Sequence, residues 1–197
     1  QTKYRQLIYT SNEIYGPINK YSGNGYKKLA EIAFLEQDYV NGISCLNKAI
    51  TIYEKLYEWD CNDVINCYSL LSSFSHFLSD NYMSFVFIRR ALEISYYTMP
   101  RNHPELITKY ISIGMYYFEQ EMFDMCKRIV DICWNICGDF YNEKDVSLQR
   151  PLLFISQSNL KCFDVDKAIE AYEKYIGILN VKKVDENVLK IGNTVLK

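Results

Sequence analysis

The sequence predicts an all-α fold, a superhelical array of antiparallel helix pairs, and three observations support this prediction. Apolar residues recur with the spacing of an amphipathic helix along the chain, and no long stretch has the alternation of a β-strand. The same pattern begins at Tyr26, Tyr68, Tyr110 and Leu152, which are 42 residues apart (68−26, 110−68 and 152−110). Small residues return in the same register, where two paired helices would touch at about 8–10 Å. Internal repetition at such a period is typical of stacked helical repeats.

Residues 1–25 are predicted to be the end of a preceding repeat followed by a loop. The first part has a helical stripe in the register of a repeat's second helix, so we expect the chain to be part of a longer protein. Gly16–Pro17, followed by Ser22, Gly23 and Gly25, predicts the loop, because glycine and proline interrupt helices.

Four repeats are predicted, starting near residues 26, 68, 110 and 152, each made of two helices joined by a tight turn. Gln37–Asp38 and Glu119–Met122 lie in two of these turns. The small residues at the predicted crossings are Ala30, Gly42 and Ala49; Ser72, Ser84 and Ala91; Gly114, Cys126 and Cys133; and Ser156 and Ala168. Unrelated amphipathic helices would not keep small residues at this interval.

The boundaries between repeats have signals of their own. Asp60 or Asn62 is a candidate N-cap for the second repeat. The third repeat opens at His103–Pro104, because proline suits a first helical turn. Pro151 is expected to delay or kink the first helix of the fourth repeat. Residues 185–197 have a helical stripe and would form a closing helix of the stack.

Length and composition limit the partners. A chain of 197 residues, 49% hydrophobic and 23% charged, can bury a core, and in a stacked array residues 1–197 would form one elongated domain. A net charge of −2 and a pI near 5.8 argue against a nucleic-acid-binding surface. No apolar run approaches the roughly 18 residues of a membrane helix. We therefore expect a protein or peptide partner, no nucleic acid and no membrane.

The cysteines are predicted to be reduced, buried thiols: Cys45, Cys61, Cys67, Cys126, Cys133, Cys137 and Cys162. An odd number scattered over helical patterns is typical of a reducing compartment and predicts a cytoplasmic or nuclear protein. Cys126, Cys133 and Cys137 share one helical face, but a zinc site needs more converging ligands, and both histidines lie in other segments. We expect no metal and no cofactor.

At the repeated positions the chain resembles the tetratricopeptide repeat (TPR) family, whose pattern combines an aromatic residue, Leu and a small residue with Ala, a large apolar residue and Ala. The best matches are Tyr26-Leu29-Ala30-Gly42-Leu46-Ala49 and Tyr110-Ile113-Gly114-Cys126-Val130-Cys133. The usual repeat has about 34 residues and a closing proline that is missing here. The 42-residue variant looks like the repeats of kinesin light chains. The resemblance implies a TPR-like solenoid that acts as a protein-interaction module.

TPR arrays bind peptides in a concave groove lined by the first helix of each repeat. The family's groove positions fall on Lys27, Glu31, Phe34, Ser69, Ser73, His76, Phe77, Ile111, Met115, Phe118, Glu119, Leu153, Gln157 and Lys161. Of these, we predict that a peptide contacts Lys27, Phe34, His76, Phe77, Ile111, Met115, Phe118 and Leu153. The alternative interpretation is that the apolar members pack against neighbouring helices, as most helical stripes do.

Chaperone-binding members of the family hold a peptide's terminal carboxylate in a clamp of basic and amide side chains. Lys27 matches one clamp position, but Glu31, Leu70, Thr108 and Ser112 replace the others. A carboxylate would face Glu31 without enough donors to compensate. The sequence therefore predicts recognition along the length of a segment and not at its terminus.

A second resemblance covers Arg89–Gly138, which is similar to the C-terminal helical domain of SET-and-MYND (SMYD-type) lysine methyltransferases. The matching residues are Asn102, His103, Pro104, Gly114, Gln120, Met122, Phe123 and Gly138. The zinc-binding cysteine cluster and the SET motif are absent from this sequence. The alternative function is thus a regulatory domain that packs on a methyltransferase's catalytic domain and shapes access of the protein substrate.

The chain itself is predicted to be non-catalytic. It has no phosphate-binding glycine loop, no GxSxG and no HExxH motif. His76 has no evident nucleophile with which to act as a general base. We therefore predict an interaction module without catalytic residues.

Overall fold

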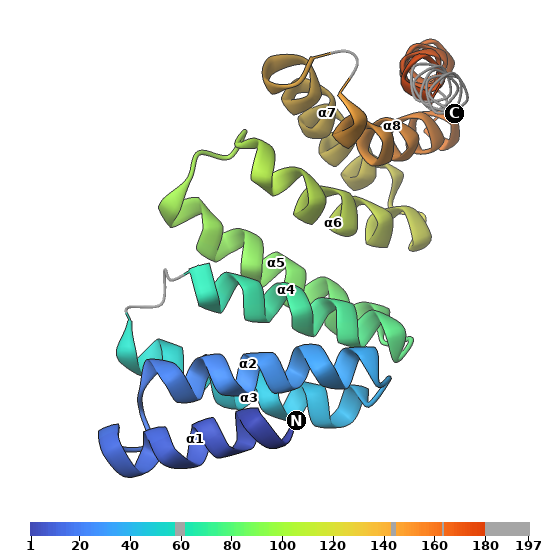
Figure 1. The fold of residues 1–197 in the computed structure, drawn as a ribbon. Coiled ribbons are helices and arrows are strands. Elements are labelled where there is room, and N and C mark those ends of the chain that lie inside the picture. The colour runs from blue at the N-terminus through green and yellow to red at the C-terminus, as the bar shows by residue number, and fades with distance from the viewer. Residues whose placement is uncertain (58–61, 143–144, 163, 180–197) are drawn as a thin grey trace, which may run out of the picture. The chain divides into compact units, whose positions relative to one another are not determined.

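The computed structural model describes residues 1–57, 62–142, 145–162 and 164–179, and these residues form helices joined by turns, with no strand (Figure 1). The all-α fold class is confirmed, and the helices pack in adjacent pairs. The chain divides into two compact units, Gln1–Arg101 and Asn102–Lys197. That the whole chain forms a single domain stays a prediction.

The first unit contains five helices within its described residues. They are α1 (Thr2–Tyr15), α2 (Lys20–Leu35), α3 (Tyr39–Leu56), α4 (Asn62–Phe77) and α5 (Asn81–Thr98). Each packs on the next helix in the chain, and Figure 1 shows α2–α3 and α4–α5 as antiparallel hairpins. The helices α2 and α3 are the first predicted repeat, and α4 and α5 are the second.

The second unit opens with a short 3₁₀ helix, η1 (Pro104–Leu106), at the predicted start of the third repeat. His103 caps it, since its Nδ1 accepts a hydrogen bond from the Glu105 N–H at 3.3 Å. The following elements are α6 (Ile107–Glu119), α7 (Phe123–Phe140), η2 (Val146–Leu148), α8 (Gln149–Lys161) and a helical stretch over 165–179. The helix α6 packs on both α7 and α8, and α7 also packs on α8.

The turns inside the first three repeats have the same backbone structure. Gln37, Ser79 and Glu121 adopt left-handed φ values of 59°, 61° and 57°, and they are 42 residues apart (79−37 and 121−79). The N–H of the next residue donates to the carbonyl five residues back, at 2.8 to 2.9 Å, in each turn. This is the Schellman motif, which satisfies carbonyls at a helix end. The 42-residue period is therefore present in the hydrogen bonds as well as in the sequence.

The small residues of the predicted crossings are buried, as expected for Ala49 and Gly114. The two glycines also face the next repeat. A Cβ on Gly42 of α3 would lie 2.2 Å from the ring of Phe74 on α4, and one on Gly114 of α6 would lie 2.4 Å from the ring of Phe154 on α8. In the second repeat the two small residues are serines, whose hydroxyls hydrogen-bond across the crossing at 3.0 Å.

The predicted loop at Ser22, Gly23 and Gly25 is wrong, because all three lie inside α2. The glycines are there for close packing: a Cβ on Gly23 would lie 2.8 Å from the ring of Tyr53, and one on Gly25 would lie 2.6 Å from Ile8. Helix α2 begins after Gly16–Pro17, where Asn19 caps it by accepting from the Ser22 N–H at 2.8 Å.

The predictions for Pro151, for the N-cap of the second repeat and for the closing helix have different outcomes. Pro151 lies in the first turn of α8, where its missing N–H needs no partner, and the helix begins two residues earlier at Gln149. The prediction that Pro151 delays the helix start is therefore wrong. Asn62 is the first residue of α4, so it lies inside the helix and is not its N-cap. Asp60 and the predicted closing helix at 185–197 lie outside the described residues.

Candidate protein-binding surface

The first helices of the two repeats in the first unit share a surface, here called the α2–α4 face. Its residues are Lys27, Glu31 and Phe34 on α2 and Asn66, Ser69, Leu70, Ser73, His76 and Phe77 on α4. Six of them, Lys27, Glu31, Asn66, Ser69, Leu70 and Ser73, line an open pocket of about 340 Å³. The helical spacing of positions 66, 70, 73 and 77 could have predicted Asn66 as a lining residue, but the carried-over family positions omitted it and included Leu70 only as a replaced clamp position.

The polar end of the α2–α4 face is held by an ion pair. Lys27 Nζ lies 2.5 Å from Asp63 Oδ1, and its side chain is only 17% exposed. Glu31 accepts from Lys28 Nζ at 2.6 Å. A peptide carboxylate that approached Lys27 would compete with a carboxylate already in place and would meet Glu31 nearby. The pocket is therefore poorly suited to a peptide's terminal carboxylate.

The other end of the α2–α4 face is aromatic. The ring centroid of Phe34 lies 5.2 Å from that of Phe77 and 5.3 Å from that of Phe74, both edge to face. Tyr39 stacks on Phe77 at 5.6 Å. Phe74 is fully buried, whereas Phe77 is 56% exposed. His76 is exposed beside Phe77, with ring centroids 6.1 Å apart. One large aromatic side chain is thus held in position by neighbours and open to a partner.

The predicted groove residues of the second unit differ in how far their side chains are exposed. Ile111 is only 1% exposed and belongs to the core, so its placement in a groove is wrong: it fills space between packed helices. Met115 is 45% exposed, and Phe118 and Leu153 are half-buried. Whether these residues continue the α2–α4 face stays a prediction.

The thiols are suited to packing and not to chemistry. No disulfide joins the described cysteines, which are Cys45, Cys67, Cys126, Cys133, Cys137 and Cys162, and Cys61 lies outside the described residues. Burial raises the pKa of Cys137 to about 12 and raises the pKa of Cys133 further, so both remain protonated at neutral pH. In the described part of the chain no group of three or more His, Cys, Asp or Glu side chains could hold a metal ion.

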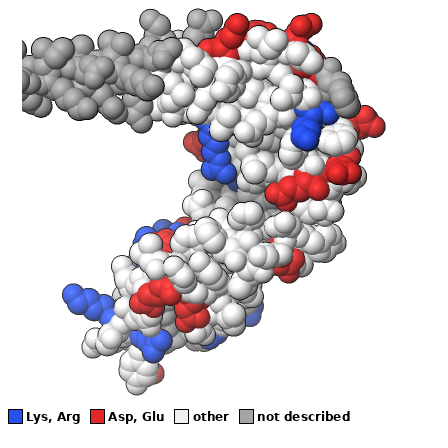
Figure 2. All heavy atoms as spheres, turned by 90° about the vertical axis from the view of Figure 1, so that its right-hand side faces the viewer, with Lys and Arg blue, Asp and Glu red and all other residues white. Residues whose placement is uncertain are grey.

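Charged side chains of both signs are interspersed among uncharged ones on the face in Figure 2. That face shows no large patch of one charge. No helix among the described residues is both long and apolar enough to cross a membrane.

Comparison with known proteins gives similar folds at low sequence identity. BtubC from P. vanneervenii superposes with a TM-score of 0.79 and 13% identity, covering 92% of this chain and 72% of that one. The apo form of RapI gives 0.75 and 16%, covering 96% and 66%. TPR-like repeats assigned to a Podospora anserina kinesin light chain give 0.71 and 10%, covering 91% and 85%. The fold is that of a TPR-like helical repeat.

Comparison of the sequence with curated proteins gives one further relative. No protein-family profile matches the chain. A clustered mitochondria protein homologue from Coccidioides immitis (strain RS) is 22% identical over 146 residues, which are 74% of this chain and 11% of that protein. The chain therefore spans about a tenth of that relative's length.

The residues that resemble lysine methyltransferases have local roles in the TPR-like fold. His103 and Pro104 cap and begin η1. Gln120 and Met122 belong to the repeated turn between α6 and α7. Gly114 lies so close to the ring of Phe154 that a Cβ would not fit there. Packing and turn geometry account for these five of the eight matching residues, and the relatives above lend the methyltransferase resemblance no support.

Proposed function

We propose that this chain is a non-catalytic protein-interaction module whose α2–α4 face binds an internal, apolar segment of a protein. The observation that supports this most is Phe77, an aromatic side chain that is 56% exposed yet fixed by Phe34 and Tyr39. Pre-positioned aromatic side chains supply large contact area at low entropic cost and are frequent hot spots of binding.

The polar pocket next to Phe77 would bind the backbone of the same segment. Asn66 offers a side-chain amide, and Ser69 and Ser73, whose hydroxyls donate to backbone carbonyls of α4 at 3.0 and 3.3 Å, can still accept hydrogen bonds from an extended or helical peptide. The ion pair between Lys27 and Asp63 leaves no free cation for a terminal carboxylate at this position. Binding should therefore depend on apolar side chains within the segment.

The bound segment belongs either to a separate partner protein or to an upstream domain of the parent chain. The second case includes the methyltransferase alternative, in which the catalytic domain would contact this surface. Met115, Phe118 and Leu153 stay proposed contact residues of the second unit. A cytoplasmic or nuclear location fits the lack of disulfides among the described cysteines and completes the proposal.

The proposal can be tested by selecting peptides from a random display library on the purified chain and measuring their affinity by fluorescence anisotropy. Peptides that bind the α2–α4 face should be rich in apolar residues and should bind regardless of a free C-terminus. Phe77→Ala should weaken them by about 2 kcal/mol, or roughly 30-fold, which is the scale of a hot spot.

Tyr82→Ala is the matched control, because Tyr82 is a similarly exposed aromatic residue on α5, outside the α2–α4 face. It should leave the affinity unchanged, and circular dichroism should show both variants fully helical. Affinity that survives Phe77→Ala, or selection of peptides bound only through a terminal carboxylate, would rule the proposal out.

A further inference from the structure

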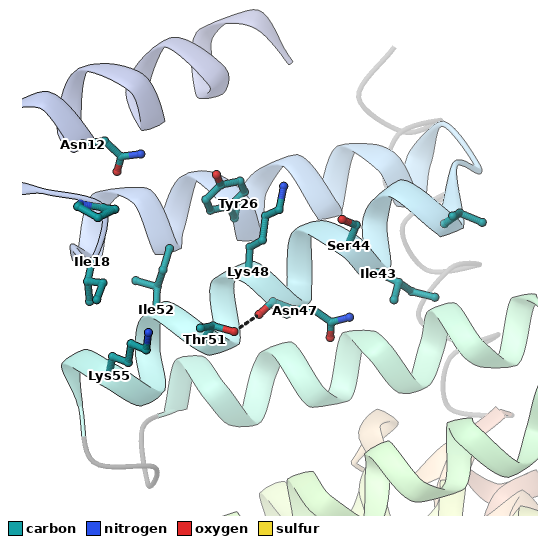
Figure 3. A pocket seen from close by; sticks show the side chains of 12 residues that line it. Asn12, Ile18, Tyr26, Ile43, Ser44, Asn47, Lys48, Thr51, Ile52 and Lys55 are labelled. Atoms are coloured by element: carbon teal, nitrogen blue, oxygen red, sulfur yellow. Dashed lines mark hydrogen bonds between the residues drawn. The ribbon is translucent and has the colours of Figure 1, made fainter.

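A separate groove in the first unit lies between α1 and α3, with α2 as its floor (Figure 3). It is formed by two adjoining open depressions of about 780 and 470 Å³, which share the lining residues Asn12, Tyr26, Ser44 and Lys48. Here α2 contributes Tyr26, Leu29 and Ala33, a different helical face from the one that carries Lys27, Glu31 and Phe34. We call this the α1–α3 groove.

The charged side chains of the α1–α3 groove are mainly basic, although the chain's net charge is −2. The larger depression has only two charged lining residues, Lys48 and Lys55, and the smaller adds Arg5. None of the three forms an ion pair with another described residue; Arg5 Nη2 donates to Gln1 Oε1 at 3.2 Å. The single lining carboxylate, Asp38, already accepts from the Asn41 side chain at 2.6 Å.

Lys48 is held in place within the groove. Its Nζ lies 5.5 Å from the centre of the Tyr26 ring, in a cation–π contact, and Figure 3 shows the two side chains next to each other. Lys55 lies seven positions further along α3 (55−48), two helical turns or about 10.5 Å away. The two cations are thus spaced by about three residues of an extended chain.

Apolar side chains flank these cations. Ile18 and Val40 are exposed, and Ile43 and Tyr26 are half-buried along the same groove. A ligand that fits must therefore bring both apolar surface and negative charge.

We propose that the α1–α3 groove is a second docking site, for an acidic amphipathic protein segment whose carboxylates pair with Lys48 and Lys55 while its apolar side chains contact Ile18, Val40 and Ile43. This site is independent of the α2–α4 face, because the two share no residue. Charge complementarity at such a site gives specificity and speeds association.

The test uses two sets of fluorescein-labelled synthetic peptides and the full chain. In the first set, two glutamates stand three positions apart among leucine, isoleucine and phenylalanine. In the second set, glutamine replaces both glutamates. Anisotropy should show the acidic set binding at least about tenfold more tightly than the glutamine set, and this difference should shrink as added salt shortens the Debye length from about 10 Å at 0.1 M to about 3 Å at 1 M.

Lys48→Glu combined with Lys55→Glu should weaken the acidic peptides by about tenfold or more. The matched control is Lys3→Glu combined with Lys20→Glu, which makes the same charge change at exposed lysines that do not line the groove. It should leave the affinity within about threefold of wild type. Lys55→Gln removes one cation without touching Tyr26, and it keeps the test valid if the double variant loses helical structure.

Equal affinity for the two peptide sets, or no binding of either, would overturn the proposal. An equal loss in the control variant would also overturn it, since the attraction would then be non-specific. Binding abolished by Phe77→Ala but not by Lys55→Gln would place the acidic peptides on the α2–α4 face and refute the second site, while leaving the first intact.

Discussion

The helices α2 in the first unit and α6 in the second unit are the first helices of the first and third repeats, but they present different chemistry. Lys27 on α2 corresponds to Ile111 on α6, two periods later (111−27 = 84). Lys27 is mostly covered and paired with Asp63, whereas Ile111 is fully buried. Both are largely inaccessible, so this register position lies in helix packing. A lysine there needs a nearby carboxylate, and an isoleucine needs none.

Positions further along the two helices are partly exposed. Seven residues on, Phe34 and Phe118 are both half-buried, and three residues before them stand Glu31, which is half-buried, and Met115, which is exposed. The repeat therefore fixes which positions are accessible, while the residue at each position decides what kind of partner the surface can bind. Three experiments test this conclusion.

The largest effect should come from the crossings, where each unit has a glycine against an aromatic ring. Gly42→Leu and Gly114→Leu would each place a side chain where even a Cβ lies within 2.4 Å of Phe74 or Phe154. Since both rings are buried and cannot move freely, each variant should lose about 3 kcal/mol of unfolding free energy, the upper end of the usual cost of overpacking. Urea unfolding followed by circular dichroism would measure this.

Gly138→Leu is the control for both, because a Cβ at Gly138 meets nothing within 4 Å. Its unfolding free energy should be unchanged or higher, since leucine favours the helical conformation more than glycine does. A loss as large as that of the other two variants would show that the crossings are not what makes Gly42 and Gly114 sensitive.

An intermediate effect is expected at the covered ion pair of the first unit. Asp63→Ser leaves Lys27 largely covered and unpaired, so it should destabilise by about 1–2 kcal/mol. Lys27→Ile combined with Asp63→Ser copies the second unit, which has Ile111 and Ser147 at the equivalent positions (147−63 = 84). This double variant should recover most of the stability. Additive losses in the double-mutant cycle would mean that the two side chains do not interact in solution.

The sequence predicted the helices, their pairing and the buried crossings because a 42-residue period constrains many positions at once. It failed at Gly23 and Gly25, since glycine is both a loop former and the residue that permits the closest helix contact. Composition alone cannot distinguish these two roles. They are distinguished by the side chain that packs on each glycine, which is Tyr53 for Gly23 and Ile8 for Gly25.

The binding surface was less predictable than the fold. Phe77 and Ile111 look alike in the sequence as apolar groove positions, but one is exposed and the other buried. The difference depends on which neighbouring side chains reach them, such as Phe34 and Tyr39 at Phe77. The groove between α1 and α3 could not be predicted from the family pattern, because that pattern directs attention to the first helices only.

The smallest effect concerns the turns, where the third repeat lacks a side-chain cap that the other repeats have at Asp38, Asp80 and Asp164. Asp38 accepts from the Asn41 N–H at 3.4 Å and Asp80 accepts from the Met83 N–H at 3.0 Å. The equivalent residue of the third repeat is Met122, which makes no side-chain cap. Its φ and ψ of −83° and 65° match the −93° and 75° of Asp80, so an aspartate would fit without strain.

Met122→Asp should therefore raise the unfolding free energy by about 1 kcal/mol, the usual contribution of an N-cap. Met122 is 47% exposed, so little apolar burial is lost. The reverse change, Asp80→Met, should lower the unfolding free energy by a similar amount, and denaturant midpoints would measure both. If Met122→Asp instead destabilised the protein while Asp80→Met behaved as expected, the methionine would have to be packing against neighbours more strongly than its exposure implies. The turns at Asp80 and Met122 would then have the same backbone conformation but be stabilised differently, one by a side-chain cap and the other by packing.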